Sequence, residues 1–189
     1  MKNVLILHGA ANNSTGNWFP WLKKELEKKG YKVWVPDLPD SEKPKSTTWL
    51  HHIFSNQDWE FNDESVIVGH SAGATFILRL LEKLPTGVKI HKAILVSGPV
   101  ELGTKKEYFQ YKKDLVKPPF RWKRIRESCD KFYFVYSDND QYECGIEQGR
   151  LLHKHLGGKL VLRPGEKHFN LESGSQYKKF PLIIKLVER

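Results

Sequence analysis

Five residues near the middle of the chain constrain its fold more than any other stretch. Gly69-His70-Ser71-Ala72-Gly73 separates a β-branched run at 66–68, which predicts a buried strand, from residues 72–84, whose apolar spacing predicts a helix. A serine flanked in this way is typical of a nucleophile elbow, where a strained backbone holds the hydroxyl over a sheet and side chains at either glycine would collide with the neighbouring elements. The alternative interpretation is a glycine-rich turn whose serine caps the helix.

Apolar runs and helical patterns alternate along the rest of the chain, which predicts an α/β fold. We expect a three-layer domain over residues 1–189, with a mostly parallel sheet of about six strands, helices on both faces, right-handed crossovers and no large cap domain. The expected strands lie at 2–8, 31–35, 66–68, 92–97, 131–136 and 159–163, and the expected helices at 18–29, 48–54, 72–84, 143–156 and 180–187.

Length and composition restrict the class of protein. The 189 residues fit one domain, and no apolar run approaches the ~20 residues of a membrane span. The first residues enter a strand pattern without a signal peptide, so we expect a cytoplasmic protein. Cys129 and Cys144 are too few for a disulfide framework and lack metal-ligand spacing, so no metal site is expected.

The net charge of +9 is concentrated in one segment, because residues 105–127 hold nine basic and three acidic side chains. No nucleic-acid motif accompanies this charge, so a solvated basic face is the favoured interpretation and binding of an anion is a secondary hypothesis. The segment is also aromatic and follows the end of an expected strand, where ligands bind in open α/β sheets. Two alternatives stay open: the segment lines or covers a site, or it is a long packed connection.

The loop after the first expected strand is built from small residues, Gly9 to Gly16. In nucleophile-elbow enzymes such a loop supplies one backbone N–H group to an oxyanion hole, and the residue after the nucleophile supplies the other. We assign these two roles to Ala10 and Ala72. An ordinary strand exit is the alternative.

Later in the chain, an acid and a histidine follow the last two expected strands. Asp138 and Asp140 stand just after the strand at 131–136, and His168 stands in a turn after the strand at 159–163. The order serine, aspartate, histidine is the one that α/β-hydrolases use for their triad. Either aspartate stands where it could orient His168.

With these residues in place, the chain resembles the α/β-hydrolases and, more narrowly, the small serine hydrolases typified by retinoblastoma-binding protein 9. The resemblance covers nearly the whole length. It rests on the ordered set of the N-terminal strand with its glycine-rich loop, 18–26, 69–73, 94–97, 122–125, the aspartate-rich turn and 168–169.

This resemblance implies a serine hydrolase that cleaves small carboxylic esters through an acyl-enzyme, without a cofactor. The orienting carboxylate of these relatives heads an Asp-Pro-aromatic turn, which falls on Asp140, although Gln141 replaces the proline and Asp138 and Glu166 are substitutes. The candidate residues are catalytic Ser71, Asp140 and His168, the N–H groups of Ala10 and Ala72, and substrate contacts from Trp18, Tyr108 and Trp122.

The expected partner is a small-molecule ester, and neither a membrane nor a nucleic acid is expected. A protein partner stays open without a specified identity. The Leu-x-Cys-x-Glu motif that would bind the retinoblastoma protein does not occur in this sequence, so that partner is not carried over. A non-catalytic binding module on a hydrolase fold is the alternative function.

Overall fold

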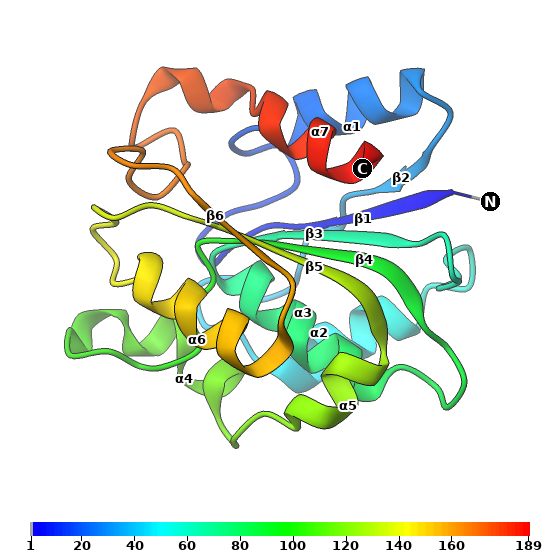
Figure 1. The fold of residues 1–189 in the computed structure, drawn as a ribbon, viewed down its shortest axis with the longest axis horizontal. Helices are drawn as coiled ribbons and strands as arrows, with labels where there is room; N and C mark the ends of the chain where they lie inside the picture. The colour runs from blue at the N-terminus through cyan, green and yellow to red at the C-terminus, as the bar shows by residue number, and fades with distance from the viewer. Residues whose placement is uncertain (1) are drawn as a thin grey trace.

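The computed structural model describes residues 2–189, and its core is one parallel sheet of six strands in the order β2-β1-β3-β4-β5-β6. Figure 1 shows this sheet between two layers of helices. The predicted three-layer α/β fold with about six strands is therefore confirmed. The strands are β1 (Asn3–Leu7), β2 (Lys32–Trp34), β3 (Val66–His70), β4 (Ile90–Val96), β5 (Cys129–Tyr136) and β6 (Lys159–Leu162).

Two helices cover one face of the sheet and five cover the other (Figure 1). The first pair is α1 (Phe19–Lys28) and α7 (Pro181–Glu188). The second layer contains α2 (Ser46–Phe54), α3 (Ala72–Lys83), α4 (Phe109–Val116), α5 (Trp122–Glu127) and α6 (Ile146–Leu156), and two short 3-10 helices, η1 (Lys106–Tyr108) and η2 (Ser175–Lys178), lie in the connections. No helix in residues 2–189 is long and apolar enough to cross a membrane.

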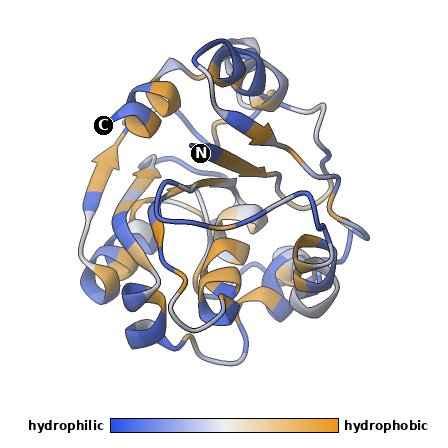
Figure 2. Cartoon of the chain, turned by 90° about the vertical axis from the view of Figure 1, so that its right-hand side faces the viewer, coloured by the Kyte–Doolittle hydropathy of each residue, from blue (hydrophilic) through white to orange (hydrophobic). Residues whose placement is uncertain are grey.

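The strands are apolar on both faces because both faces are covered. In β1, Val4 and Ile6 belong to the core cluster under α1 and α7, whereas Leu5 and Leu7 belong to the cluster on the opposite face. Successive side chains of a strand point to opposite faces, so an uninterrupted apolar run fills both cores. Figure 2 shows the apolar residues gathered in the strands and on the helix sides that face them.

The strand order places a switch point between β1 and β3. The chain leaves β1 through α1 to reach the edge strand β2, and it then returns through α2 to β3 on the other side of β1. Loops that leave two such strands at their carboxyl ends separate and form a crevice, which is where ligands bind in open α/β sheets. Residues 8–17 and Ser71 lie at these two strand ends.

The basic segment divides into two parts with different roles. Arg121 and Arg124 donate hydrogen bonds to the backbone carbonyls of Glu82 and Leu84, at 2.8 and 2.6 Å, so the C-terminal part fastens α5 to the end of α3. Tyr108 and Lys112, in contrast, line a cavity. One part of this segment therefore packs on α3, and the other contributes to a cavity wall.

Candidate active site

Ser71 lies in the predicted sharp turn between β3 and α3, with φ 55° and ψ −125°. The turn requires both flanking glycines. A Cβ at Gly69 would lie 2.7 Å from the backbone of Ala74, and a Cβ at Gly73 would lie 2.3 Å from the carbonyl oxygen of His8. No real Cβ fits at such distances, so β1, β3 and α3 pack this closely only around glycine. The collisions predicted from the sequence are confirmed.

The start of α3 leaves backbone donors beside the hydroxyl. The first bonds of the helix are donated by the N–H groups of Ala74 and Thr75 to the carbonyl of Ser71, so the N–H groups of Ala72 and Gly73 precede the intrahelical ladder. The positive end of the helix dipole lies at the same point. Negative charge that develops near Ser71 Oγ would therefore be stabilised there.

The loop after β1 approaches the serine from the other side. A Cβ built on Gly9 would lie 2.9 Å from the Cβ of Ser71, so only glycine permits this approach. Ala10 and Ala11 follow and line the same cavity as Ser71 and Ala72. The structure thus brings Ala10 and Ala72, the two expected oxyanion donors, to the same cavity.

His8 fixes the direction of this loop. Its Nε2 accepts the backbone N–H of Leu38 at 2.8 Å, so its Nδ1 carries the proton and donates to the carbonyl of Gly9 at 2.8 Å. In a trans peptide the carbonyl of Gly9 and the N–H of Ala10 point in opposite directions, so His8 also orients that N–H. Burial lowers the pKa of His8, which keeps the ring neutral as these two bonds require.

His168 and Asp140 form a hydrogen-bonded pair, with 2.6 Å between Nδ1 and Oδ2. Both side chains are buried, at 5% and 0% exposure. The remaining oxygen of Asp140 accepts the backbone N–H groups of Tyr142 and Cys144, at 2.8 and 3.4 Å. The carboxylate therefore has a fixed orientation and holds the imidazole of His168 through Nδ1.

The charge state of Asp140 follows from these contacts. Burial acts to raise the pKa of this carboxyl group, but the hydrogen bond and the charge of His168, together with the two backbone N–H groups, outweigh burial and lower it. The two other acids that were candidates for orienting His168 contact other residues. Asp138 accepts the N–H of Gly165 at 2.9 Å, and Glu166 binds Arg163 at 2.8 Å.

Two buried side chains hold the loop that carries His168. His70 binds the carbonyl of His168 through Nε2 at 2.7 Å, and the indole N–H of Trp18 donates to the carbonyl of Phe169 at 3.0 Å. Burial lowers the pKa of His70 to about 3, so its ring stays neutral. No role was predicted for His70. The signal was present, since a polar residue that ends a buried strand needs a hydrogen-bond partner.

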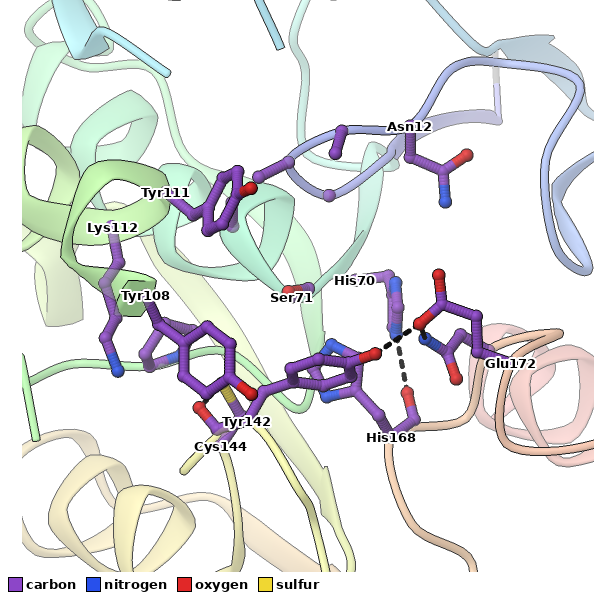
Figure 3. A pocket seen from close by; sticks show the side chains of 16 residues that line it. Asn12, His70, Ser71, Tyr108, Tyr111, Lys112, Tyr142, Cys144, His168 and Glu172 are labelled. Carbon is purple, nitrogen blue, oxygen red and sulfur yellow. Dashed lines mark hydrogen bonds between the residues drawn. The ribbon is translucent and has the colours of Figure 1, made fainter. Parts of the chain in front are cut away.

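These groups surround a cavity of about 280 Å³, and Ser71 and His168 both line it. Figure 3 shows Ser71 near the centre of this cavity, with Tyr108, Tyr111 and Lys112 on one side of it and Glu172 on the other. The cavity is lined by Gly9, Ala10, Ala11, Asn12, His70, Ser71, Ala72, Pro99, Tyr108, Tyr111, Lys112, Tyr142, Cys144, His168, Asn170 and Glu172.

Of the three aromatic residues expected to contact a substrate, Tyr108 lines the cavity and the other two do not. Trp18 is completely buried, because its ring packs against Phe19 and Phe180 while its N–H holds the carbonyl of Phe169. Trp122 belongs to α5 and stacks on His155 with 4.4 Å between ring centroids. Both tryptophans therefore have structural contacts instead of the expected contact with substrate.

Cys144 is a cavity residue that sequence reasoning set aside. Its sulfur and the side chains of Asp140 and His168 lie within 4.8 Å of one another. The 2.6 Å between His168 Nδ1 and Asp140 Oδ2 is shorter than the ~3.3 Å that separates two ligands of a tetrahedral ion, and it fits a hydrogen bond. Burial also raises the pKa of Cys144 well above its ordinary value, so the thiol keeps its proton.

The chain is similar in sequence to known hydrolases. The chain is 31% identical to YdeN of Bacillus subtilis (strain 168) over 140 residues, which cover 74% of this chain and 72% of that protein. It is 26% identical to the serine hydrolase RBBP9 of Rattus norvegicus over 168 residues, 86% of this chain and 83% of the relative.

Solved structures show the same architecture. The crystal structure of the ydeN gene product from B. subtilis superposes with a TM-score of 0.89 at 26% identity, over 100% of this chain and 97% of that one. Est1E from Butyrivibrio proteoclasticus, at 15% identity, shares the fold with a TM-score of 0.72 over 100% and 87% of the two chains. The model of the serine hydrolase family matches residues 4–189. The chain therefore belongs to the serine hydrolase family.

Proposed function

We propose that this hydrolase cleaves small carboxylic esters through an acyl-enzyme formed on Ser71. The observation that carries the proposal is the Asp140–His168 hydrogen bond, because it holds through Nδ1 a histidine that lines the same cavity as Ser71. A serine at a helix N-terminus, a histidine and a buried carboxylate together are the groups that acyl transfer requires.

In the proposed reaction, His168 Nε2 takes the proton of Ser71 Oγ as this oxygen attacks the acyl carbon. The oxygen of the tetrahedral intermediate accepts hydrogen bonds from the N–H groups of Ala10 and Ala72. His168 then returns its proton to the departing alcohol, and the acyl group stays on the serine. Water attacks the acyl-enzyme with His168 again as base, which releases the acid and restores Ser71 Oγ–H.

The first test is covalent labelling with a fluorophosphonate probe, read by intact mass. We expect one adduct on the native chain, none on Ser71→Ala, and strongly slowed labelling of His168→Ala. Ser55→Ala serves as the matched control, since Ser55 is exposed at the end of α2 and should leave labelling unchanged. The absence of an adduct on the folded native chain would contradict the proposal and favour a non-catalytic binding module.

The second test separates the two aspartates of one turn. Asp140→Asn keeps the shape of the side chain but removes the charge that fixes the tautomer of His168, so kcat for a 4-nitrophenyl ester should fall by about 10³- to 10⁴-fold. Asp138→Asn removes a carboxylate charge two residues away. Because the Asp138 side chain accepts the N–H of Gly165 and is not bonded to His168, kcat should change by less than about threefold. Equal losses in the two variants would show that Asp140 has no special role.

A further inference from the structure

Lys112 is a buried cation in the wall of the cavity that contains Ser71. It lies in α4, is 3% exposed and lines the cavity beside Tyr108 and Tyr111. Within residues 2–189 its ammonium nitrogen has no hydrogen-bond acceptor. A buried ammonium group without hydrogen-bond acceptors is costly, so an acceptor on a bound molecule that met this group would be favoured.

The nearest carboxylate, that of Glu143, does not fill this role. Its oxygen lies 3.8 Å from the Lys112 nitrogen, which allows charge attraction but exceeds hydrogen-bond distance. Glu143 is already used by a neighbouring loop, because it accepts the hydroxyl and N–H of Thr104 at 2.6 and 3.0 Å and the N–H of Lys105 at 3.0 Å. Glu143 thus holds residues 104–105, and the Lys112 donors stay unused.

The neighbouring cations of the basic segment do not lie in the cavity wall. Lys113 is exposed on the outer side of α4, and Arg121 is bonded to Glu82. Among the cavity residues within 2–189, Lys112 is the one lysine or arginine and Glu172 is the one carboxylate. Figure 3 shows the two on opposite sides of Ser71, and Glu172 is hydrogen-bonded to the hydroxyl of Tyr142. The cavity is therefore electrostatically polar, with its cationic end at α4.

We propose that Lys112 binds a carboxylate on the acyl chain of the substrate, so that the enzyme prefers half-esters of dicarboxylic acids to neutral esters. This proposal rests on the ester hydrolysis proposed above. In the proposed complex the acyl carbon lies at Ser71 Oγ and the chain extends past Tyr108 and Tyr111. The Lys112 ammonium group, which is buried in the free structure, turns towards the cavity to meet the carboxylate. The carboxylate accepts the N–H groups that the protein leaves unused, and a neutral acyl chain at this end would leave them unpaired.

The test compares kcat/KM for mono-4-nitrophenyl esters of four- to six-carbon dicarboxylic acids with neutral 4-nitrophenyl esters of equal length. Enzyme-free rates are subtracted and the ionic strength is constant. The native enzyme should favour the anionic ester at one or more lengths. Lys112→Met, which keeps an apolar side chain of similar length, should lower the anionic-to-neutral ratio by about 10- to 100-fold. Lys112→Arg should retain part of the preference.

Lys113→Met is the matched control, because it removes the same charge from the same helix at an exposed position and should leave the ratio unchanged. An equal fall in both variants would show a general field effect and overturn the assignment to Lys112. A native enzyme that hydrolyses neutral esters without preferring any anionic one would also overturn it, whereas failure to hydrolyse any ester would count against the proposed function instead.

A second measurement needs no variant, in case Lys112→Met does not fold. Free dicarboxylates should protect Ser71 of the native chain from the fluorophosphonate probe at lower concentrations than monocarboxylates of equal length. Equal protection by the two classes of acid would contradict a carboxylate site at Lys112.

Discussion

The backbone of Ser71 offers a direct test of the strain in the elbow. Its φ of 55° and ψ of −125° belong to a region that side chains avoid and glycine adopts freely. Ser71→Ala keeps the Cβ and its strain, while Ser71→Gly removes both, and neither variant retains the hydroxyl. Comparing the stability of these two inactive variants therefore isolates the backbone from the chemistry of the serine.

The size of the effect follows from two opposing contributions. A residue held in a sparsely populated region costs about 1–3 kcal/mol, which glycine would release. Glycine also loses more chain entropy on folding, which costs about 0.5–1 kcal/mol relative to alanine. Ser71→Gly should therefore be more stable than Ser71→Ala by about 0.5–2 kcal/mol, equivalent to about 1–8 °C in Tm for a chain of this length.

The assay is equilibrium unfolding in urea, with thermal unfolding beside it. Ser55 provides the control, because it is exposed and has φ −81° and ψ −10°, where a Cβ is not strained. At Ser55 the glycine variant should be less stable than the alanine variant. If the glycine variant is less stable than the alanine variant by the same amount at Ser71 and at Ser55, the elbow stores no strain and the prediction is wrong.

Two further predictions concern buried basic groups. Burial holds the pKa of His70 at about 3, below its ordinary 6.5. Between these two pH values the unfolded chain binds a proton at this residue that the folded chain does not bind. The free energy of unfolding should therefore fall as the pH drops from 6.5 towards 3, by up to about 1.4 kcal/mol per pH unit from this group. His70→Gln retains an N–H donor for the carbonyl of His168 but does not titrate. Denaturation of this variant over the same pH range should show a shallower slope of unfolding free energy against pH. An unchanged slope would exclude His70 as the titrating group. Lys92 is fully buried and donates to the carbonyls of Leu186 and Val187, both at 2.8 Å, so Lys92→Met should cost about 1–3 kcal/mol by freeing the end of α7. Lys131→Met, at the exposed position paired with Lys92 on β5, should be close to neutral in the same unfolding measurement.

Much of the fold was predictable because the sheet is covered on both faces. Strands of that kind are uninterrupted apolar runs, and the helices between them show a 3.6-residue period. The helices of the basic segment were not predicted. The α4 and α5 helices have 8 and 6 residues, which is too short for a helix to be stable alone. They form because both pack against α3, and α5 also packs against β5 and α6.

The sequence by itself determined the elbow, since glycine at 69 and 73 is the only residue type that allows β1, β3 and α3 to approach so closely. It also determined the order of Ser71, an acid and His168. The order of residues left Asp138 and Asp140 open, and the family resemblance favoured Asp140. The tertiary structure places Asp140 against His168, a contact over 28 residues that depends on how two loops meet. Tertiary structure likewise decided that Trp18 supports the histidine loop and that Lys112, among nine basic residues of its segment, reaches the cavity. Residue type sets what a side chain can do, and packing of distant segments sets which partner it meets.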